Sequence, residues 1–333
     1  MDSIDFVILW VDGNDPKWLS EKNRYYEVET NTKGNQENRF RDWGLLKYWF
    51  RGVEKNVPWV NKIFFVTYGH IPSWLNTENP KLKIVKHEDF IPKEYLPTFN
   101  SNVIQYYLNR IEGLSERFVM FDDDIFVLKS VKENDFFEGD CICDMYREDT
   151  IYTSTMGDTY PHCLLNNVQC INTYYSKRKV YRKNIGKYFN VKYGLENTIR
   201  TLLLLPWSHF VNIYNPHICH AYTKYGYDLF WKYCGTQLKI LSSNRFRKIT
   251  DYSTHLVRCI LLLEGKFVPR SYKFGKRVEI REDTSKICDI IKKQKCHVLC
   301  INDTDSKIDF EKTKNEIICA FEVILPDKCS FEV

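Results

Sequence analysis

Over its first 130 residues the chain alternates short apolar runs with amphipathic segments. The runs at 4–11, 62–67, 82–85 and 118–121 are rich in β-branched and aromatic residues, and each predicts a buried strand. Apolar positions at 42–55 recur with helical spacing, and Asn100 or Ser101 can cap a second helix that continues to residue 111. Strands that alternate with helices predict a Rossmann-like α/β fold, with a mostly parallel sheet and flanking helices.

Residues 131–235 lack this alternation and contain many Tyr and Asn residues. They predict a helical or irregular insertion into a catalytic core formed by residues 1–130 and 236–333. In the second part of the core we expect helices at 251–264 and 311–323 and a strand at 297–301. We expect this strand to rejoin the main sheet.

Acidic residues follow three of the expected strands. Asp12 and Asp15 follow the first strand, Asp122-Asp123-Asp124 the fourth, and Asn302-Asp303 the last. In open α/β sheets, ligands bind beyond the carboxyl ends of the strands. On an extended segment Asp122 and Asp124 share a face, where they could hold one Mg²⁺ or Mn²⁺ that also contacts phosphates. The alternative is a solvated acidic turn, which the flanking apolar runs disfavour.

Other residues could complete a site of this kind. Trp10, Asp12, Gly13 and Asp15 could clamp a nucleotide by stacking, hydroxyl binding and close backbone approach. His217 and His220 could be a metal pair, an acid/base or structural residues, and Arg247 could bind phosphate or lie on a solvated helix start. Together these residue types indicate phosphate-linked chemistry, for which a nucleotide-sugar enzyme is the natural class.

Composition and charge narrow further the class of protein and its possible partners. The chain has 333 residues, of which 44% are hydrophobic, and a net charge of +5 that does not indicate nucleic acid as a partner. Neither a signal peptide nor an apolar run of the ~18–20 residues needed for a membrane span is recognisable, so we expect a cytoplasmic protein, at most peripheral to the inner face of the membrane. The twelve cysteines have no structural-zinc spacing and are expected to be reduced, mostly buried thiols.

Longer sequence words resemble the Stealth family of capsular polysaccharide phosphotransferases, which is related to the GlcNAc-1-phosphotransferase α/β subunit. Four regions of that family are recognisable in order. They include residues 4–15, Phe40-Arg41-Asp42 with residues 58–60, 71–75, 96–101 and 110–115, then Asp122–Asp124, His217–His220 with Phe246-Arg247, and residues 299–303 with 330–332.

The resemblance implies transfer of a sugar-1-phosphate from a UDP-sugar to a hydroxyl of an acceptor glycan, with release of UMP, on a GT-A-like fold. It places catalytic roles on Asp124, His217 and Arg247, and a Mg²⁺ (or Mn²⁺) site at Asp124, Asp122, Asn302 and Asp303. The expected donor-binding residues are Trp10, Asp12, Gly13, Asp15, Arg41, Asp42, Asn100, Gln105 and His220. Expected partners are the nucleotide-sugar donor and a glycan or lipid-linked acceptor, which can be polyanionic, with a peripheral membrane contact or a capsule-assembly complex as further candidates.

The chain departs from the family pattern at Gln105, where relatives usually carry a functional Glu. Gln cannot act as a base or a strong metal ligand. Two alternatives to the phosphotransferase are a metal-dependent GT-A glycosyltransferase that releases UDP, and an inactive glycan-binding relative. Basic residues interleaved with aromatic ones at 177–183 and 266–281 predict a groove for a polyanionic acceptor or a contact with anionic lipid.

Overall fold

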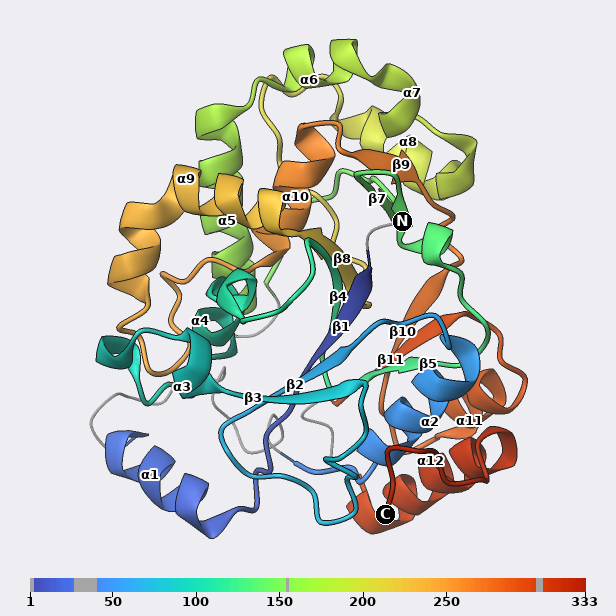
Figure 1. Cartoon of the computed structure of the whole chain (residues 1–333). Helices are drawn as coiled ribbons and strands as arrows, with labels where there is room; N and C mark the ends of the chain where they lie inside the picture. Colours follow the sequence, from blue (N-terminus) through green and yellow to red (C-terminus); the bar gives the residue numbers. More distant parts are fainter. Residues whose placement is uncertain (1–2, 27–40, 154–155, 304–307) are drawn as a thin grey trace.

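The structure is a computed structural model that describes residues 3–26, 41–153, 156–303 and 308–333 (Figure 1). In the described part, the central sheet has the order β3 (Leu82–Lys86), β2 (Ile63–Thr67), β1 (Ile4–Leu9), β4 (Arg117–Phe121) and β8 (His220–Thr223). The first four strands are parallel to one another, and β8 runs antiparallel to β4. Every residue of β2 and β4 is buried, which explains their apolar sequences, interrupted only by Thr67 at the end of β2 and Arg117 at the start of β4. The predicted mostly parallel α/β sheet is confirmed.

Helices cover the sheet and connect its strands. They are α1 (Pro16–Tyr26), α2 (Leu46–Asn56), α3 (His87–Phe90) and α4 (Ser101–Tyr106), with 3-10 turns at Lys93–Tyr95 and Leu108–Arg110. The side chain of Asn100 accepts a hydrogen bond from the Asn102 N–H and so caps α4, as the sequence predicts. Helix α2 approaches the backbone closely at Gly52, where a Cβ would lie 2.6 Å from the Val127 carbonyl oxygen. A larger residue at Gly52 would therefore push α2 away from β5 (Ile125–Val127).

The C-terminal strand does not join the central sheet. Strand β11 (Val298–Asn302) lies between β10 (Gly275–Glu279), which is parallel to it, and β5, which is antiparallel. The prediction that this strand returns to the main sheet is wrong, because β5 leaves the end of β4 and offers its own edge for pairing. The polar end of β11 still lies close to the acidic triplet, since the Ile301 N–H donates to the Asp124 carbonyl at 2.8 Å.

Residues 131–235 are partly helical but also contribute strands. They hold a 3-10 turn at Glu133–Asp135, β6 (Phe137–Glu138), β7 (Cys141–Asp144), α5 (Tyr160–Tyr174), α6 (Lys177–Lys183), α7 (Ile185–Tyr188), a 3-10 turn at Val191–Tyr193, α8 (Leu195–Leu204) and β8. Strand β8 belongs to the central sheet, and residue 235 lies inside α9 (Lys224–Leu241). The segment expected as an insertion thus contributes an edge strand to the central sheet.

The remaining elements close the fold around the sheets. They are α10 (His255–Leu263), β9 (Phe267–Pro269), α11 (Ser285–Lys292) and α12 (Phe310–Ile324). Strand β9 pairs with β7, and α11 packs against α12 on the side of β10 and β11 (Figure 1). After α12 the tail is fixed by a buried ion pair, in which Arg51 Nε lies 2.6 Å from Glu332 Oε1.

All twelve cysteines lie in the described part of the chain and are free thiols, nine of them buried. This confirms the prediction of mostly buried cysteines. Within the described residues, no helix is both long and apolar enough to cross a membrane.

Candidate active site

Strand pairing brings three separate loops to one edge of the central sheet. Strands β1 and β4 are parallel neighbours in which Ile8 pairs with Phe121, so the turn after β1 and the triplet after β4 begin side by side. Strand β8 runs the opposite way, with His220 opposite Met120. The loop that precedes β8, which carries His217, therefore lies at the carboxyl end of β4.

Asp124 is the meeting point of these segments. His217 Nε2 lies 3.9 Å from Asp124 Oδ2, and the Cys300 thiol donates to the same oxygen at 3.3 Å. Asp122 faces another direction, where Gln105 Nε2 donates to its Oδ1 at 3.4 Å. The Gln105 Oε1 accepts a hydrogen bond from Thr254, so the amide is held from both sides. Gln105 thus contacts the acidic triplet directly. This is the position at which the resemblance predicts a Glu and this chain has a Gln.

The three carboxylates disfavour one another's ionisation. Burial raises the pKa of Asp122, and the nearby Arg247 guanidinium opposes this rise. Desolvation by the surrounding residues and the Asp122 charge raise the pKa of Asp123, whose side chain is nevertheless exposed at the surface, and Asp42 makes a smaller contribution. Burial and then Asp122 and Asp123 hold the pKa of Asp124 well above its usual range. Concentrated negative charge of this kind is what a cation or a cationic side chain would stabilise.

The residues at Asp124 fit a divalent cation. Its Oδ1 is buried and has no hydrogen-bond partner among the described residues. Asp124, His217 and Cys300 each present a possible ligand atom, and these atoms all lie within 4.8 Å of one another. The Asp124 carboxylate suits Mg²⁺ or Mn²⁺, whereas a thiol does not. We therefore interpret Cys300 as the hydrogen-bond donor that orients Asp124.

The other expected metal ligands have different contacts. Asp303 pairs with Arg41, whose Nη2 lies 3.1 Å from Oδ1, and accepts a hydrogen bond from Trp43 Nε1 at 3.1 Å. Asn302 donates to the Asp303 carbonyl at 3.4 Å. Neither they nor Asp122 belong to the group around Asp124 in the described residues. Phe40, which begins the motif before Arg41, lies outside the described residues.

The turn after β1 is fixed by its own hydrogen bonds. The Asn14 N–H donates to Asp12 Oδ1 at 2.9 Å, and the Trp18 N–H donates to Asp15 Oδ1 at 2.6 Å, so Asp15 caps α1. His70 Nε2 accepts from the Asp12 N–H at 2.8 Å. Gly13 lies within this turn. The carboxylate of Asp12 is thereby held at the carboxyl end of β1.

A hollow of about 250 Å³ lies beside this turn. Trp10 and Asp12 line it from one side and Asp42 and Gly44 from another, together with residues 71–74. Two of the separate sequence motifs therefore meet around one space. Asp42 is also close enough to Asp123 to influence its pKa, which connects the hollow with the acidic triplet.

Arg247 is held against the first turn of α4. Its Nε and Nη2 both donate to Ser101 Oγ, the former at 3.1 Å. Asn100 is fully buried, and its Nδ2 donates to Asp251 Oδ2 at 2.8 Å and to the Phe246 carbonyl at 3.2 Å. The amide of Asn100 therefore braces the loop that carries Arg247, a role the sequence did not indicate.

The two histidines of the third motif occupy different environments. His217 is partly exposed and has a positive φ of 47°, a left-handed conformation that is uncommon for residues other than Gly. His220 is buried in β8, with Nε2 3.1 Å from Asn215 Oδ1. The same oxygen accepts from the His217 N–H at 2.9 Å. Asn215 and His220 thus support the loop that presents His217.

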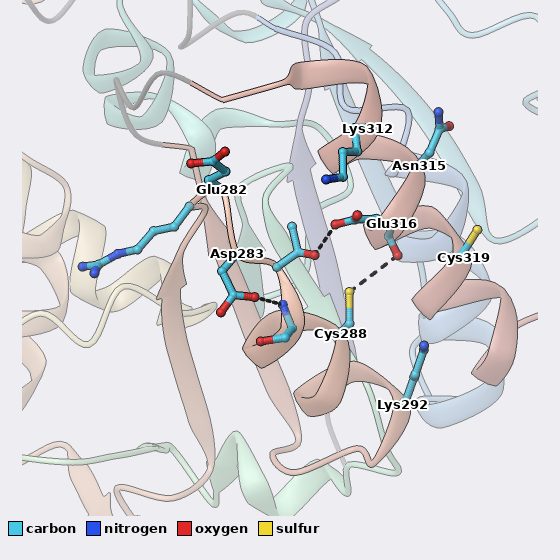
Figure 2. Close-up of a pocket in the computed structure, with 11 residues that line it drawn as sticks. Glu282, Asp283, Cys288, Lys292, Lys312, Asn315, Glu316 and Cys319 are labelled. Carbon is cyan, nitrogen blue, oxygen red and sulfur yellow. Dashed lines mark hydrogen bonds between the residues drawn. The ribbon is translucent and has the colours of Figure 1, made fainter.

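A second hollow lies between α11 and α12 (Figure 2). It measures about 1090 Å³ and is lined by the 281–285 segment and by residues such as Cys288, Lys312 and Glu316. It contains none of the predicted site residues. The segment that lines it follows Ile280, whose N–H donates to the Asn302 carbonyl at 3.0 Å, so this hollow opens next to the end of β11.

Two of the predicted basic residues are not at the surface. Lys177 is buried and pairs with Glu148 at 2.7 Å, and Arg270 is buried beside Asp144 at 3.7 Å. Including them in an exposed basic surface was wrong, because each neutralises a buried carboxylate. Arg277, in contrast, is exposed on β10 directly beside Cys300 on β11.

Sequence reasoning missed Cys300, Ser101 and Asn215 as contacts of the site. Period-two alternation in the strand at 297–301 could have placed Cys300 on the same face as Asn302. The contacts of Ser101 and Asn215 depend on loops that are distant in sequence, and no local pattern indicates them.

The chain matches the family models for Stealth protein conserved region 1 at residues 2–26 and conserved region 2 at residues 39–144. It is 41% identical to the capsular polysaccharide phosphotransferase WcwK of Streptococcus pneumoniae over 100% of this chain and 98% of that protein. It is 36% identical to the exopolysaccharide phosphotransferase cps2G of Lactiplantibacillus plantarum (99% and 96%) and 34% identical to the receptor polysaccharide phosphotransferase WefC of Streptococcus gordonii (100% and 100%).

Solved structures with a weaker likeness include the WbbM bifunctional glycosyltransferase, with a TM-score of 0.39, 8% identity and coverage of 96% of this chain and 50% of that one. The galactosyltransferase LgtC is another, with a TM-score of 0.38, 9% identity and coverage of 95% of both chains. The full-length sequence matches, in contrast, are decisive: the chain belongs to the Stealth family of phosphotransferases.

Proposed function

We propose that the protein transfers a sugar-1-phosphate from a UDP-sugar to a hydroxyl of an acceptor glycan during capsular or cell-surface polysaccharide synthesis. The observation that carries this proposal is the convergence of Asp124, His217 and the Arg247 loop at the carboxyl ends of β4 and its neighbours. The names of the full-length relatives, all polysaccharide phosphotransferases, support the reaction class.

In this reaction the acceptor hydroxyl oxygen attacks the phosphorus that bears the donor sugar. A new phosphorus–oxygen bond forms, the bond to the UMP oxygen breaks, and UMP leaves with that electron pair. The hydroxyl proton passes to His217 Nε2, which is partly exposed and is steadied by Asp124 at 3.9 Å. His217 acts here as a general base, and Asp124 stabilises the imidazolium that forms.

Arg247 suits the charge that develops on the transferred phosphoryl group. A guanidinium offers a rigid, two-pronged donor for phosphate oxygens, and Ser101 holds this one in orientation. Asp124 would hold a Mg²⁺ or Mn²⁺, which would neutralise the diphosphate of the donor.

The donor nucleotide is assigned to the hollow beside the β1 turn. Trp10 provides an aromatic face for a base, and Asp12 and Asp42 provide acceptors for ribose hydroxyls. Arg41, held by Asp303 at 3.1 Å, lies next to Asp42 and is available to a diphosphate. Asn100 and Gln105 serve this site indirectly, since their amide groups are engaged by protein groups. His220 also serves it indirectly, through the contact of its Nε2 with Asn215.

The test is an assay of the purified chain with a panel of UDP-sugars and a glycan acceptor, with and without Mg²⁺ or Mn²⁺. We expect metal-dependent UMP release that matches phosphodiester formation. Release of UDP would instead assign the protein as a glycosyltransferase. Binding of glycan without turnover of any donor would assign it as an inactive glycan-binding relative.

A further inference from the structure

Helix α8 is oriented in the opposite way to an ordinary amphipathic helix, since its polar face is buried and its apolar face is exposed. Its polar residues Asn197 and Thr201 face the protein and are 8% and 1% exposed. Its apolar residues Leu195, Ile199 and Leu202 recur at helical spacing on the outer side, and Leu195 is 77% exposed. An apolar stripe that faces solvent while the polar face is buried indicates a surface that binds another protein or a membrane.

The orientation of α8 is fixed by specific hydrogen bonds. Asn197 Oδ1 accepts from Arg147 Nη1 at 2.8 Å, and Thr201 Oγ1 accepts from the Glu148 N–H at 3.1 Å. The C-terminal end of α8 is held by Lys177, whose Nζ donates to the Leu204 carbonyl at 2.7 Å. The helix therefore cannot rotate its leucines inward without losing these contacts.

The exposed apolar surface extends beyond α8. We define the apolar patch as the exposed residues Ile185, Val191, Leu195, Ile199, Leu202, Leu203, Leu205 and Trp207. Val191 is 95% exposed and Trp207 is 56% exposed. In Figure 1, α6, α7 and α8 gather at the end of the molecule opposite to α1 and α12. The patch thus occupies one pole of the protein.

Positive charge is concentrated at the same pole. Residues 171–210 contain eight Lys and Arg residues and one acidic residue, Glu196; without Lys177, which is buried against Glu148, their net charge is still +6. Arg178, Lys179, Arg182 and Lys183 are exposed on α6, which contacts α8 through Lys177. Apolar side chains bordered by basic ones, with an exposed Trp, complement an anionic lipid surface.

We propose that the apolar patch docks the protein onto the surface of an anionic membrane, with the basic residues of α6 facing the lipid headgroups. The leucines of α8 insert at the boundary between headgroups and acyl chains, and α8 lies in the plane of the surface. This contact is peripheral. It does not depend on the proposed reaction, because it uses none of the residues of the candidate active site.

The experiment is sedimentation of the purified full chain with vesicles of phosphatidylcholine, alone or with about one third phosphatidylglycerol. We expect binding to the mixed vesicles that weakens at high salt, and little binding to the neutral ones. The double variant Leu195→Gln/Leu203→Gln should bind the mixed vesicles at least about tenfold more weakly. A matched control, Ile240→Gln/Val323→Gln, alters residues of similar exposure elsewhere, 69% and 63%, and should bind like the unmodified chain.

A second variant separates charge from apolar contact. Replacing Arg178, Lys179, Arg182 and Lys183 together with Gln should abolish the preference for anionic vesicles. Failure of the unmodified chain to bind mixed vesicles, or equal binding by the Leu195→Gln/Leu203→Gln variant, would overturn the proposal. A dimer in light scattering that this variant dissociates would also overturn it and assign the patch to a second copy of the chain. Turnover of a short soluble acceptor is measured separately, so a failure of the proposed reaction is distinguishable from a failure of docking.

Discussion

His217 Nε2 lies 3.9 Å from Asp124 Oδ2, although Asp124 directly follows β4 and His217 comes much later in the sequence, just before β8. The antiparallel pairing of β8 with β4 creates this proximity. It gives a partly exposed imidazole a carboxylate partner at a strand end, which supports the proposed role of His217 as a general base.

Asp124→Asn should therefore reduce turnover by about two orders of magnitude or more, with little change in thermal stability. The amide keeps the size of the side chain but loses the charge that supports His217 and binds a cation. Initial rates of UMP release and a thermal melt measure the two effects. Asp140→Asn, at an exposed position, serves as the matched control, and a near-normal rate for the folded Asp124 variant would remove Asp124 from the chemistry.

Gln105→Glu should make the stability of the protein depend on a divalent cation. The new carboxylate would replace the Nε2 donor that now faces Asp122 Oδ1 at 3.4 Å, so two negative charges would meet at a nearly buried position. We expect a melting temperature several degrees lower in EDTA, largely restored by Mg²⁺ or Mn²⁺. Gln105→Ala, which removes the donor without adding charge, should lose stability equally with and without metal. If Gln105→Glu behaves in the same way, position 105 does not face the cation.

Arg247→Lys should lower turnover at least about tenfold although the charge is kept. A lysine cannot form the paired contacts that the Nε and Nη2 of Arg247 make with Ser101, and it cannot grip phosphate oxygens from two directions. Arg245→Lys, two residues away and close to the Tyr25 ring, is the control and should retain activity. A normal turnover number with a raised KM for the donor would assign Arg247 to donor binding alone.

The local pattern of the sequence identified β1 to β4, β11 and the acidic triplet, but it did not identify β5 to β10 or the long-range partners. Apolar runs with charges at their ends are enough to locate β1 and β4 together with Asp12 and Asp122. The pairing of β11 with β5, and hence the contact of Cys300 with Asp124, depends on which edge is free in the folded sheet. The orientation of α8 could not be predicted for the same reason. Its leucines are typical of core residues in the sequence, but the hydrogen bond between Arg147 and Asn197 turns the polar face of the helix inward.

The stability of the protein should fall in acid partly because of His255. Burial, reinforced by Arg258, lowers the pKa of His255 to about 3, while an unfolded chain would have the ordinary value near 6.5. Between about pH 6.5 and 3 the unfolded state therefore binds more protons, and His255 reduces the free energy of unfolding by up to ~1.4 kcal/mol per pH unit as the pH falls.

His255→Gln should flatten this dependence, because glutamine can still donate to the Ile213 carbonyl that His255 Nε2 now reaches at 2.9 Å but does not titrate. Urea unfolding at a series of pH values measures the slope. His162→Gln, at an exposed site on α5, should leave the slope unchanged. If the free energy of unfolding depends on pH with the same slope in the His255 variant and the unmodified protein, this histidine does not contribute to acid sensitivity.

Charge reversal at Lys273, Lys276 and Arg277 should raise the apparent KM for long polyanionic acceptors more than for short ones. All three residues are exposed at or just before β10, and Arg277 lies beside Cys300, so they form a basic edge leading toward Asp124. A phosphodiester-linked glycan carries one negative charge per linkage, so a longer chain would contact more of this edge. The effect should diminish at high salt, since exposed charges are screened beyond about 8–10 Å.

Reversal of Lys232, Lys239 and Lys286, which are exposed elsewhere, is the control for the change in net charge. Equal losses on short and long acceptors would instead assign the three residues to the local structure of β10, because a fold defect at β11 and Asp124 affects every substrate alike.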